Sequence, residues 1–395
     1  MSLLIDPPAW PARGRLWSHL VSDTSADELH AFAASAGLPP RGFHLDHYDV
    51  PAPAYDRVVA AGARPVSSRE LVSTLVRTGQ RRRTSDTLRP RRPGARLLRP
   101  PALRRGDSVA VVAPSGRVPA DRLERGLAVL RSWGLVVRLG EHVLGAHPRL
   151  HHLAGSDADR AHDLEEAWTH PDVRAVIAAR GGSGAHRLLD QLDWDRLAAA
   201  TARVLVGFSD ITALHEAFAS RLGVVGVHGP TVTSLGAADA ESALALRALL
   251  MGADRPVLGG TTLVPGVAEG VLVGGNLAVL AASVGGALSR PAAGGIAVLE
   301  DVAEPAFRVD RLLTQLVRSG WFDGVRGVAL GAFSECDDPA QVDAVLAERL
   351  RPLEVPVLTG LPLGHVAANR ALPLGVRARL DADAGTLSLL DRPLR

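Results

Sequence analysis

The stretch "VLVGFSDITALHEAFA" (residues 204–219) runs from an apolar strand pattern through a Gly-Phe-Ser-Asp turn into a helical pattern without a break. A strand that turns directly into a helix is typical of α/β proteins. The hydroxyl of Ser209, at this corner, has two interpretations. It is either the N-cap of the following helix or the nucleophile of an elbow whose next backbone N–H stabilises an oxyanion. The stretch lacks the Gly-x-Ser-x-Gly form of the α/β-hydrolases, so its residues alone leave both interpretations open.

The preceding sequence repeats the alternation of strand and helix. Successive patterns for strand, helix, strand, helix and strand lie in residues 107–116, 119–134, 135–140, 158–169 and 173–179. This order predicts a doubly wound, flavodoxin-like parallel sheet in residues 106–236. Ligands bind such sheets at the carboxyl ends of the strands, where "RGGSG" (180–184) and "GFSD" (207–210) both fall. We therefore expect two loops that are distant in sequence to form one site.

The rest of the chain differs in composition from this lobe. Residues 263–395 contain short, glycine-punctuated strand patterns with helices between them and predict a more β-rich α/β lobe. Residues 237–262 are expected to connect the two lobes. Residues 1–80 predict a small additional α/β domain, and the Arg- and Pro-rich residues 81–105 read as a solvated linker.

The composition restricts the compartment and the partners. A single cysteine, Cys336, cannot form an intramolecular disulfide, which agrees with a reducing compartment. No apolar run reaches the roughly 18 residues that cross a bilayer, so we expect a cytoplasmic protein without a membrane partner. The linker holds ten arginines against one acid, Asp86. No aromatic residue is interleaved with them, which weighs against a nucleic-acid partner.

A serine nucleophile needs a base and a group that orients the base. Two candidates lie in the C-terminal lobe. Glu300 ends the apolar strand pattern of "GIAVLED" (295–301), and His365 lies in the loop "LPLGHVAANRALPLG" (361–375). Each also reads as an ordinary residue, a solvated acid at a strand end and a loop histidine, so neither identifies a site alone.

Seven segments together resemble the successive blocks of the LD-carboxypeptidase family, which comprises cytosolic serine peptidases of murein recycling and their microcin C immunity relatives. In chain order these segments are "GDSVAVVAPSG" (106–116), residues 153–195 with "RGGSG", "VLVGFSDITALH" (204–215), "GVHGP" (226–230), "GGNLAVLAASVGG" (274–286), "VLEDVAEPAFRVDRLLTQL" (298–316) and "LGHVAANRALPLG" (363–375). The resemblance covers about residues 104–390.

The resemblance implies a triad of Ser209 as nucleophile, His365 as base and Glu300 as orienting acid. It also implies an oxyanion hole made by the backbone N–H groups of Asp210 and Gly182, with no cofactor and no metal. The implied reaction releases the terminal D-Ala from murein tetrapeptides, whose third residue is diaminopimelate or Lys. One alternative is cleavage of a peptidyl-nucleotide conjugate, and another is a non-catalytic module that binds cell-wall peptides. Proteins of this kind are usually dimers, so a homodimer is expected.

Several further residues are candidates for substrate binding or for support of the site. A peptide carboxylate needs a cation or N–H groups, and the candidates are Arg180, Ser183, Arg308, Asn369 and Arg370. The family usually has Tyr where this chain has Ser183, and often Tyr where it has Phe208. Asn276 and Asn369 are also expected to be structural loop residues that hold Glu300 and His365. His228, in "VHGP", could line the cleft, but a hydrogen-bonded structural role is favoured.

The N-terminal segment resembles a small bacterial domain family whose function is not established. Its polar residues are suited to a metal or phosphoryl site. They are Asp6, His19, Asp23, His30, His44, His47 and Asp49. His19, His44 and His47 are the metal-ligand candidates, while His19 and His30 fall in patterns that read as helical, where a hydrogen-bonded histidine is the commoner role.

Overall fold

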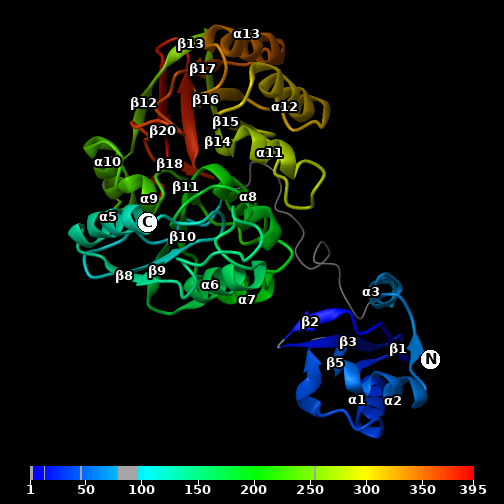
Figure 1. Cartoon of the computed structure of the whole chain (residues 1–395). Helices are drawn as coiled ribbons and strands as arrows, with labels where there is room; N and C mark the ends of the chain where they lie inside the picture. Colours follow the sequence, from blue (N-terminus) through cyan, green and yellow to red (C-terminus); the bar gives the residue numbers. More distant parts are fainter. Residues whose placement is uncertain (1–2, 13, 45–46, 79–96, 253–254) are drawn as a thin grey trace. The chain divides into compact units, whose positions relative to one another are not determined.

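The computed structural model describes residues 3–12, 14–44, 47–78, 97–252 and 255–395 (Figure 1). The chain divides into two compact units, Met1–Arg89 and Pro90–Arg395. Most of the expected linker, residues 81–96, lies outside the described residues. No helix in the described part of the chain is both long enough and apolar enough to cross a membrane.

The first lobe of the larger unit is built on a six-stranded sheet. In spatial order its strands are β8 (Val136–Leu139), β7 (Ser108–Val112), β9 (Val173–Ala178), β10 (Val204–Gly207), β11 (Gly226–His228) and β18 (Leu372–Leu374). The first five are parallel, and in chain order they follow the sequence 2-1-3-4-5, which is the flavodoxin-like order. The doubly wound lobe expected from the sequence is therefore present.

Helices cover both faces of this sheet (Figure 1). On one face α5 (Ala120–Ser132), α9 (Val232–Leu235) and α10 (Ala240–Leu250) share a core with the strands. The other helices are α6 (Asp157–Thr169), α7 (Trp194–Ala199) and α8 (Thr212–Arg221). They meet through Trp168 and Trp194, whose rings contact Phe218 edge-on. Short 3-10 turns, η3 (Ala185–Leu188) and η4 (Ser209–Ile211), follow β9 and β10.

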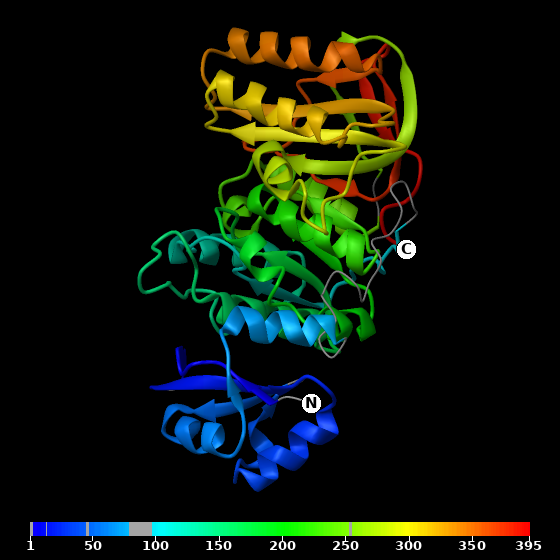
Figure 2. The same ribbon diagram turned by 90° about the vertical axis from the view of Figure 1, so that its right-hand side faces the viewer.

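The second lobe is an eight-stranded mixed sheet with helices on one face (Figures 1 and 2). Its strand order is β12 (Val257–Gly259), β20 (Thr386–Leu389), β19 (Arg377–Asp381), β14 (Val267–Asn276), β15 (Gly295–Val302), β16 (Gly327–Ser334), β17 (Val357–Thr359) and β13 (Thr261–Val264). Strands β14 to β17 are mutually parallel. One face of this sheet packs against α11 (Leu277–Ser283), α12 (Ala306–Arg318) and α13 (Pro339–Leu350), after which comes η5 (Arg351–Leu353). The alternate residues of the same strands form a second apolar cluster.

The junction between the lobes differs from the expected connection at 237–262. This segment includes β12 and the start of β13, which form the two edges of the second sheet. The C-terminal segment also returns to the first lobe, because β18 pairs antiparallel with β11 and Leu394 lies in the first lobe's core.

The last part of the expected linker is packed onto the larger unit instead of being solvated. Leu97 and Leu103 are buried. The backbone N–H groups of Leu98 and Leu103 donate to Gly223 and Leu250. Burial of the apolar side chains explains the difference, because each removes hydrocarbon from water while Arg99, Arg104 and Arg105 stay exposed.

The described residues of the smaller unit form a six-stranded sheet and three helices. Its strands run in the order β4 (Phe43–His44), β5 (His47–Pro51), β3 (Arg15–Ser22), β1 (Leu3–Ile5) and β6 (Arg64–Pro65), and β2 (Trp10–Ala12) also pairs with β3. Its helices are α1 (Ala26–Ser35), α2 (Tyr55–Ala60) and α3 (Ser68–Arg77), and its short turns are η1 (Pro40–Gly42) and η2 (Ala52–Ala54). The expectation that His19 is helical is wrong, because His19 lies on β3. Burial alternates around His19, since Ser18 and Leu20 are buried and Trp17 and His19 are half-buried, as in a strand with one face in the core.

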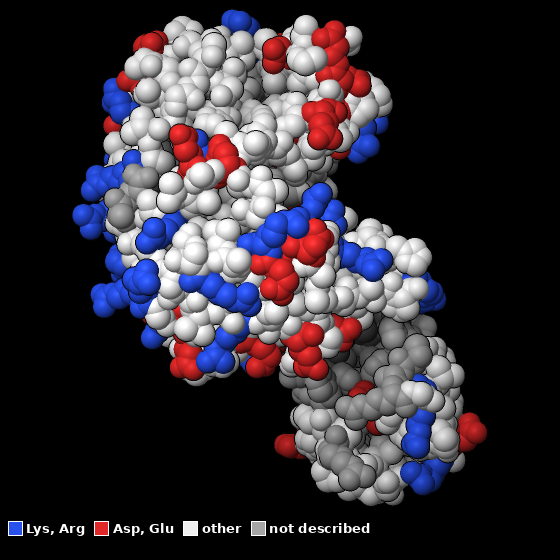
Figure 3. Space-filling model, turned by 60° about the vertical axis from the view of Figure 1, so that its left-hand side comes forward, with Lys and Arg blue, Asp and Glu red and all other residues white. Residues whose placement is uncertain are grey.

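Charged side chains are mixed over the surface of the larger unit. Figure 3 shows basic and acidic groups interspersed on one face. Many form ion pairs, such as Arg187 with Asp157 and Arg196 with Glu166. Exposed pairs of this kind contribute about 0–1 kcal/mol each.

Candidate active site

Ser209 occupies the corner between β10 and α8 in a left-handed backbone conformation. Its φ is +62°, which is uncommon for a residue other than glycine. Ser209 is not a helix N-cap, since η4 begins after Phe208 and α8 after Ile211, neither with a side-chain cap. Backbone strain of this kind costs on the order of 1–3 kcal/mol and is concentrated at functional sites. The geometry therefore resembles a nucleophile elbow more than a capped helix.

The "RGGSG" loop lies directly against this corner. A Cβ added to Gly181 would come within 2.9 Å of Ser209 Cβ, so only glycine permits this approach. The next residue, Gly182, has a φ of +121° and lines the same pocket as Ser209. The two loops that the sequence predicts to meet are thus adjacent.

Asp210 ties three strand-end loops together. Its buried carboxylate accepts hydrogen bonds from Ser115 Oγ, after β7, at 2.7 Å and from the backbone N–H of Ala185, after β9, at 2.8 Å. Arg160, also buried, donates to the carbonyls of Pro114 and Gly184 in the same two loops. These bonds fix the loops around Ser209. Neither Ser115 nor Arg160 could be singled out from the periodicity of the sequence.

Glu300 and His365 form a hydrogen-bonded pair contributed by the second lobe. His365 Nδ1 lies 2.8 Å from Glu300 Oε2, with the carboxylate fully buried and 21% of the imidazole exposed. Gly364 permits this contact, because a Cβ there would lie 2.3 Å from Glu300 Oε2. The Gly364 N–H donates to Asn369 Oδ1 at 3.0 Å, which holds the loop.

A second buried acid next to Glu300 joins the two lobes. Asp301 accepts bonds from Asn276 Nδ2 and the Ala278 N–H, both at 2.9 Å. Burial raises its pKa to about 6 against the opposing effect of these bonds. The Asn276 N–H donates to Thr212 Oγ1 of α8 at 3.0 Å. Asn276 therefore has the structural role expected for it and couples Ser209's helix to Glu300's strand.

Ser209 and His365 line one pocket of about 690 Å³. Within the described residues no hydrogen bond joins their side chains, and such bonds are often long before substrate binds. The lining is mostly small, apolar or neutral polar residues. Its polar members include Arg122, Arg180, Thr231, Thr233, Ser234, Glu335 and Asn369.

Aromatic rings pack behind the imidazole of His365. The Phe208 ring centroid lies 4.8 Å from that of His365 and 5.9 Å from that of His228. His228 is fully buried, and neither ring nitrogen has a hydrogen-bond partner among the described residues. Burial lowers its pKa, so this ring stays neutral. His228 is not among the described residues that line the pocket. The hydrogen-bonded role expected for it is wrong, because neither ring nitrogen has a partner among the described residues.

The expected substrate-binding residues divide into two groups. Arg180 and Asn369 line the pocket, and Arg180 also donates to the carbonyl of Arg117 at 2.7 Å. Ser183 and Arg308 are exposed and are not among the described lining residues, and Arg308 pairs with Glu304 at 2.8 Å.

Arg370 is engaged elsewhere. Its guanidinium donates to Asp239, Ser242 and Glu241 at the start of α10, so it braces that helix. Among the lining residues that the sequence analysis missed are two charged ones. Arg122 lies on α5, a helix that the sequence predicted without a candidate site residue. Glu335 follows β16 and has a φ of +53°.

The candidate metal ligands of the smaller unit lie in different places. His19, His47 and Asp49 come together on one side of the sheet. His30 instead bonds Tyr48 Oη at 2.8 Å, and Asp23 accepts from Thr24 Oγ1. The side chain of His44 lies outside what the structure describes.

Comparison with known proteins gives matches along both units. Family models match residues 109–229 (LD-carboxypeptidase N-terminal domain), 269–380 (LD-carboxypeptidase C-terminal domain) and 3–78 (Protein of unknown function, DUF4031). A putative carboxypeptidase of Streptomyces coelicolor is 51% identical over 75% of this chain and 97% of its own length. The murein tetrapeptide carboxypeptidase of Pseudomonas aeruginosa is 40% identical over 70% of this chain and 93% of its own.

Solved structures with the same architecture cover the larger unit. The muramoyltetrapeptide carboxypeptidase from Oxalobacter formigenes superposes with a TM-score of 0.64 at 34% identity, covering 71% of this chain and 97% of that one. The microcin C7 self-immunity protein MccF superposes with a TM-score of 0.69 at 23% identity, covering 75% and 100%. At 23% identity, the similarity to MccF shows a shared fold only.

Proposed function

Since the chain belongs to the LD-carboxypeptidase family, we propose that it releases the terminal D-Ala from murein tetrapeptides through a triad of Ser209, His365 and Glu300. The observation that carries the proposal is that a serine on a strained strand-to-helix corner and a carboxylate-bound imidazole line one pocket. A pocket of about 690 Å³ is within the usual range for small ligands.

The buried pair sets the protonation of the base. With a proton on His365 Nδ1 donated to Glu300 Oε2, Nε2 keeps its lone pair. That lone pair accepts the proton of Ser209 Oγ as the oxygen attacks the carbonyl before D-Ala. The ionised Glu300 then stabilises the imidazolium, at a site without solvent on the carboxylate.

The reaction is completed in two steps. The carbonyl oxygen takes up negative charge, and we assign its stabilisation to the backbone N–H groups of Asp210 and Gly182. D-Ala leaves as its nitrogen receives the proton from His365 Nε2. A water molecule then attacks the acyl-enzyme, with the same imidazole as base, and Ser209 is regenerated. No step requires a cofactor.

The D-Ala carboxylate is assigned to the arginine side of the pocket. Arg180 and Arg122 are the cations among the described lining residues. Arg180 lies in the same loop as Gly182. One segment therefore supplies both the proposed carboxylate contact and one N–H group of the proposed oxyanion hole. We place the reaction in the cytoplasm, in cell-wall recycling, and a homodimer stays a prediction.

The decisive experiment incubates the purified chain with murein tetrapeptide and follows released D-Ala by mass spectrometry. We expect turnover by the wild type and a loss of at least about 10⁴-fold in Ser209→Ala, as for other serine triads. Ser132→Ala is the matched control. This serine is the last residue of α5, its hydroxyl donates to the Val129 carbonyl, and it is not among the described lining residues of the pocket.

The same assay separates the rival functions. Cleavage of a peptidyl-adenylate mimic without release of D-Ala would move the assignment to a peptidyl-nucleotide hydrolase. Tetrapeptide binding without turnover would indicate a binding module. Equal turnover by Ser209→Ala and the wild type would disprove the nucleophile.

A further inference from the structure

The smaller unit gathers His19, His47 and Asp49 on one face of its sheet. In the register of β3 and β5, His19 pairs directly with Asp49, and His47 precedes Asp49 by two residues. Side chains at directly paired positions, and at positions two apart on one strand, point to the same face. Tyr48 and Val50, which alternate with them, are buried in the opposite core.

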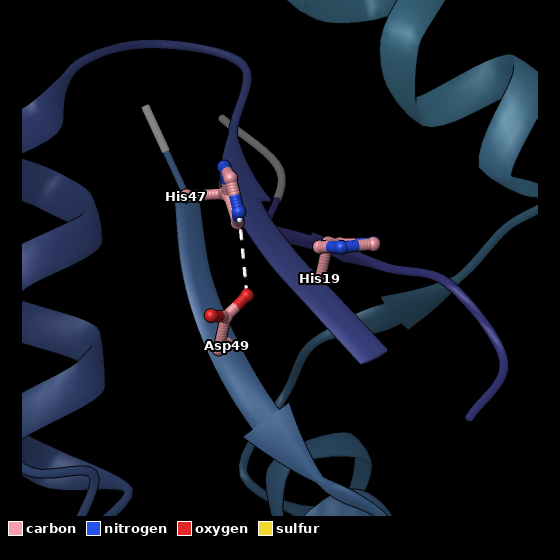
Figure 4. Close-up of side chains that lie close together, drawn as sticks. All are labelled: His19, His47 and Asp49. Carbon is pink, nitrogen blue, oxygen red and sulfur yellow. Dashed lines mark ion pairs between the residues drawn. The ribbon is translucent and has the colours of Figure 1, made fainter. Parts of the chain in front are cut away.

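The three side chains are close enough to share one ion. Their candidate ligand atoms all lie within 4.8 Å of one another. His47 Nε2 and Asp49 Oδ1 are already 3.3 Å apart (Figure 4). Two ligands bound at about 2.1 Å to a tetrahedral ion are separated by about 3.4 Å. That pair has ligand spacing as it stands, and the candidate ligand atom of His19 lies within 4.8 Å of both.

A buried carboxylate holds the His19 ring. His19 Nδ1 lies 3.1 Å from Asp6 Oδ2, and Asp6 is 1% exposed. Trp10 Nε1 and Ser68 Oγ donate to the same oxygen, at 3.0 and 2.7 Å. When Nδ1 donates its proton to a carboxylate, Nε2 is left as the metal-binding atom. Metal-bound histidines commonly have this second interaction, which fixes their tautomer and ring direction.

We propose that His19 Nε2, His47 and Asp49 bind one Zn²⁺ ion. Two imidazoles and a carboxylate form a ligand set of catalytic zinc sites, in which a fourth position stays open to water. Asp49 is 46% exposed, and Trp10, whose ring lies 5.3 Å from that of His19, is 48% exposed. The site therefore faces solvent, as an open position requires, and its free position suits water or an anionic oxygen ligand. The strand register also sets His44 opposite His47, but the proposal does not need it.

The test uses the full chain, stripped of metal with a chelator and titrated with Zn²⁺ against a chromophoric competitor. We expect the wild type to bind one tight equivalent. His47→Ala and Asp49→Asn should each weaken that equivalent by at least about 100-fold. The matched controls are His30→Ala and Asp56→Asn, exposed residues of the same unit outside the cluster, which should leave it unchanged.

Cobalt substitution gives an independent readout. Co²⁺ in the wild type should show the intense visible absorption of a four-coordinate site, and Asp49→Asn, which preserves side-chain volume, should lose it. Circular dichroism checks that each variant is folded. The absence of a tight equivalent in the wild type, or equal affinity in the wild type, His47→Ala and Asp49→Asn, would overturn the proposal.

Discussion

The two units each contain a histidine held by a buried carboxylate. In the larger unit His365 Nδ1 lies 2.8 Å from Glu300, and in the smaller unit His19 Nδ1 lies 3.1 Å from Asp6. The carboxylates are 0% and 1% exposed, and the imidazoles 21% and 27%. The pairs therefore have nearly the same geometry and the same access to solvent.

The two histidines differ in the side chains that lie near them on the side away from the carboxylate. The free nitrogen of His365 shares a pocket with Ser209, while His19 is next to His47 and Asp49. In both proposals the carboxylate has the same role, which is to fix the tautomer and the direction of the ring. The neighbouring side chains distinguish the two roles that we propose for the other nitrogen, which are to accept a proton in the larger unit and to bind a cation in the smaller one. A carboxylate–histidine pair alone does not define a function.

Glu300→Gln tests the pair in the larger unit and should have the largest effect. The amide keeps the shape but removes the charge and offers the wrong tautomer, so kcat for tetrapeptide should fall by about 10³–10⁴-fold. KM should change little, because Glu300 has no exposed surface for substrate. Zn²⁺ affinity should stay at the wild-type value. A small loss in kcat, under about tenfold, would show that Glu300 does not orient the base.

Asp6→Asn is the corresponding change in the smaller unit. Loss of the carboxylate behind a metal-bound histidine typically weakens metal binding by about 10–100-fold. Tetrapeptide turnover should be unchanged, which gives each variant its control in the other unit. Asp6 is suited to this role because, although burial opposes ionisation, hydrogen bonds from His19, Ser68 and Trp10 lower its pKa to about 2. Unchanged Zn²⁺ affinity in a folded Asp6→Asn would remove Asp6 from the proposed site.

Glu216 shows what burial does to a carboxyl that has no histidine partner. It accepts the backbone N–H of Arg290 at 3.1 Å, and burial raises its pKa to about 8 in spite of Arg290's charge. The folded state thus holds the proton more tightly than the unfolded chain. The contribution of protonated Glu216 to folding stability is fully present at pH values below the ordinary pKa of glutamate. It is lost as the pH rises from that value through about 8.

Glu216→Gln, which mimics the protonated acid, should remove this loss. The wild type should lose at most about 1.4 kcal/mol of unfolding free energy per pH unit from this group within that window. Urea unfolding of the larger unit at pH 6 and pH 8 measures it. A pH dependence in Glu216→Gln as steep as that of the wild type would contradict the raised pKa.

The first lobe could be predicted from sequence because its signals are local. Apolar strands alternate with helices that have their own boundaries, such as α5 between Pro119 and Gly134. The parallel arrangement then places Gly182 and Ser209 at one sheet edge. Glu300 and His365 carry no such signal, and only the family resemblance singled them out before the structure placed them 2.8 Å apart.

The remaining features depend on pairings between distant segments. The short strand β18 has no pattern of its own and exists because β11 has a free edge. Arg370 was a substrate candidate, and only the position of α10 shows that it is already bonded. His19 was expected in a helical pattern, and the structure places it on β3, whose eight residues include polar and apolar side chains on both faces. Its strand partner β5 resolves the ambiguity.

The return of β18 to the first sheet makes the two lobes of the larger unit one inseparable body. A gene split between β11 and β18 would yield an N-terminal fragment in which β11 lacks its neighbour β18 and exposes backbone N–H and C=O groups, which favours edge-to-edge aggregation. The other fragment would carry Leu372–Leu374 without β11 to pair with. Fragment complementation would follow the same boundary: a split protein reporter built on this fold must keep β11 and β18 in different halves and use their pairing as the event that restores it.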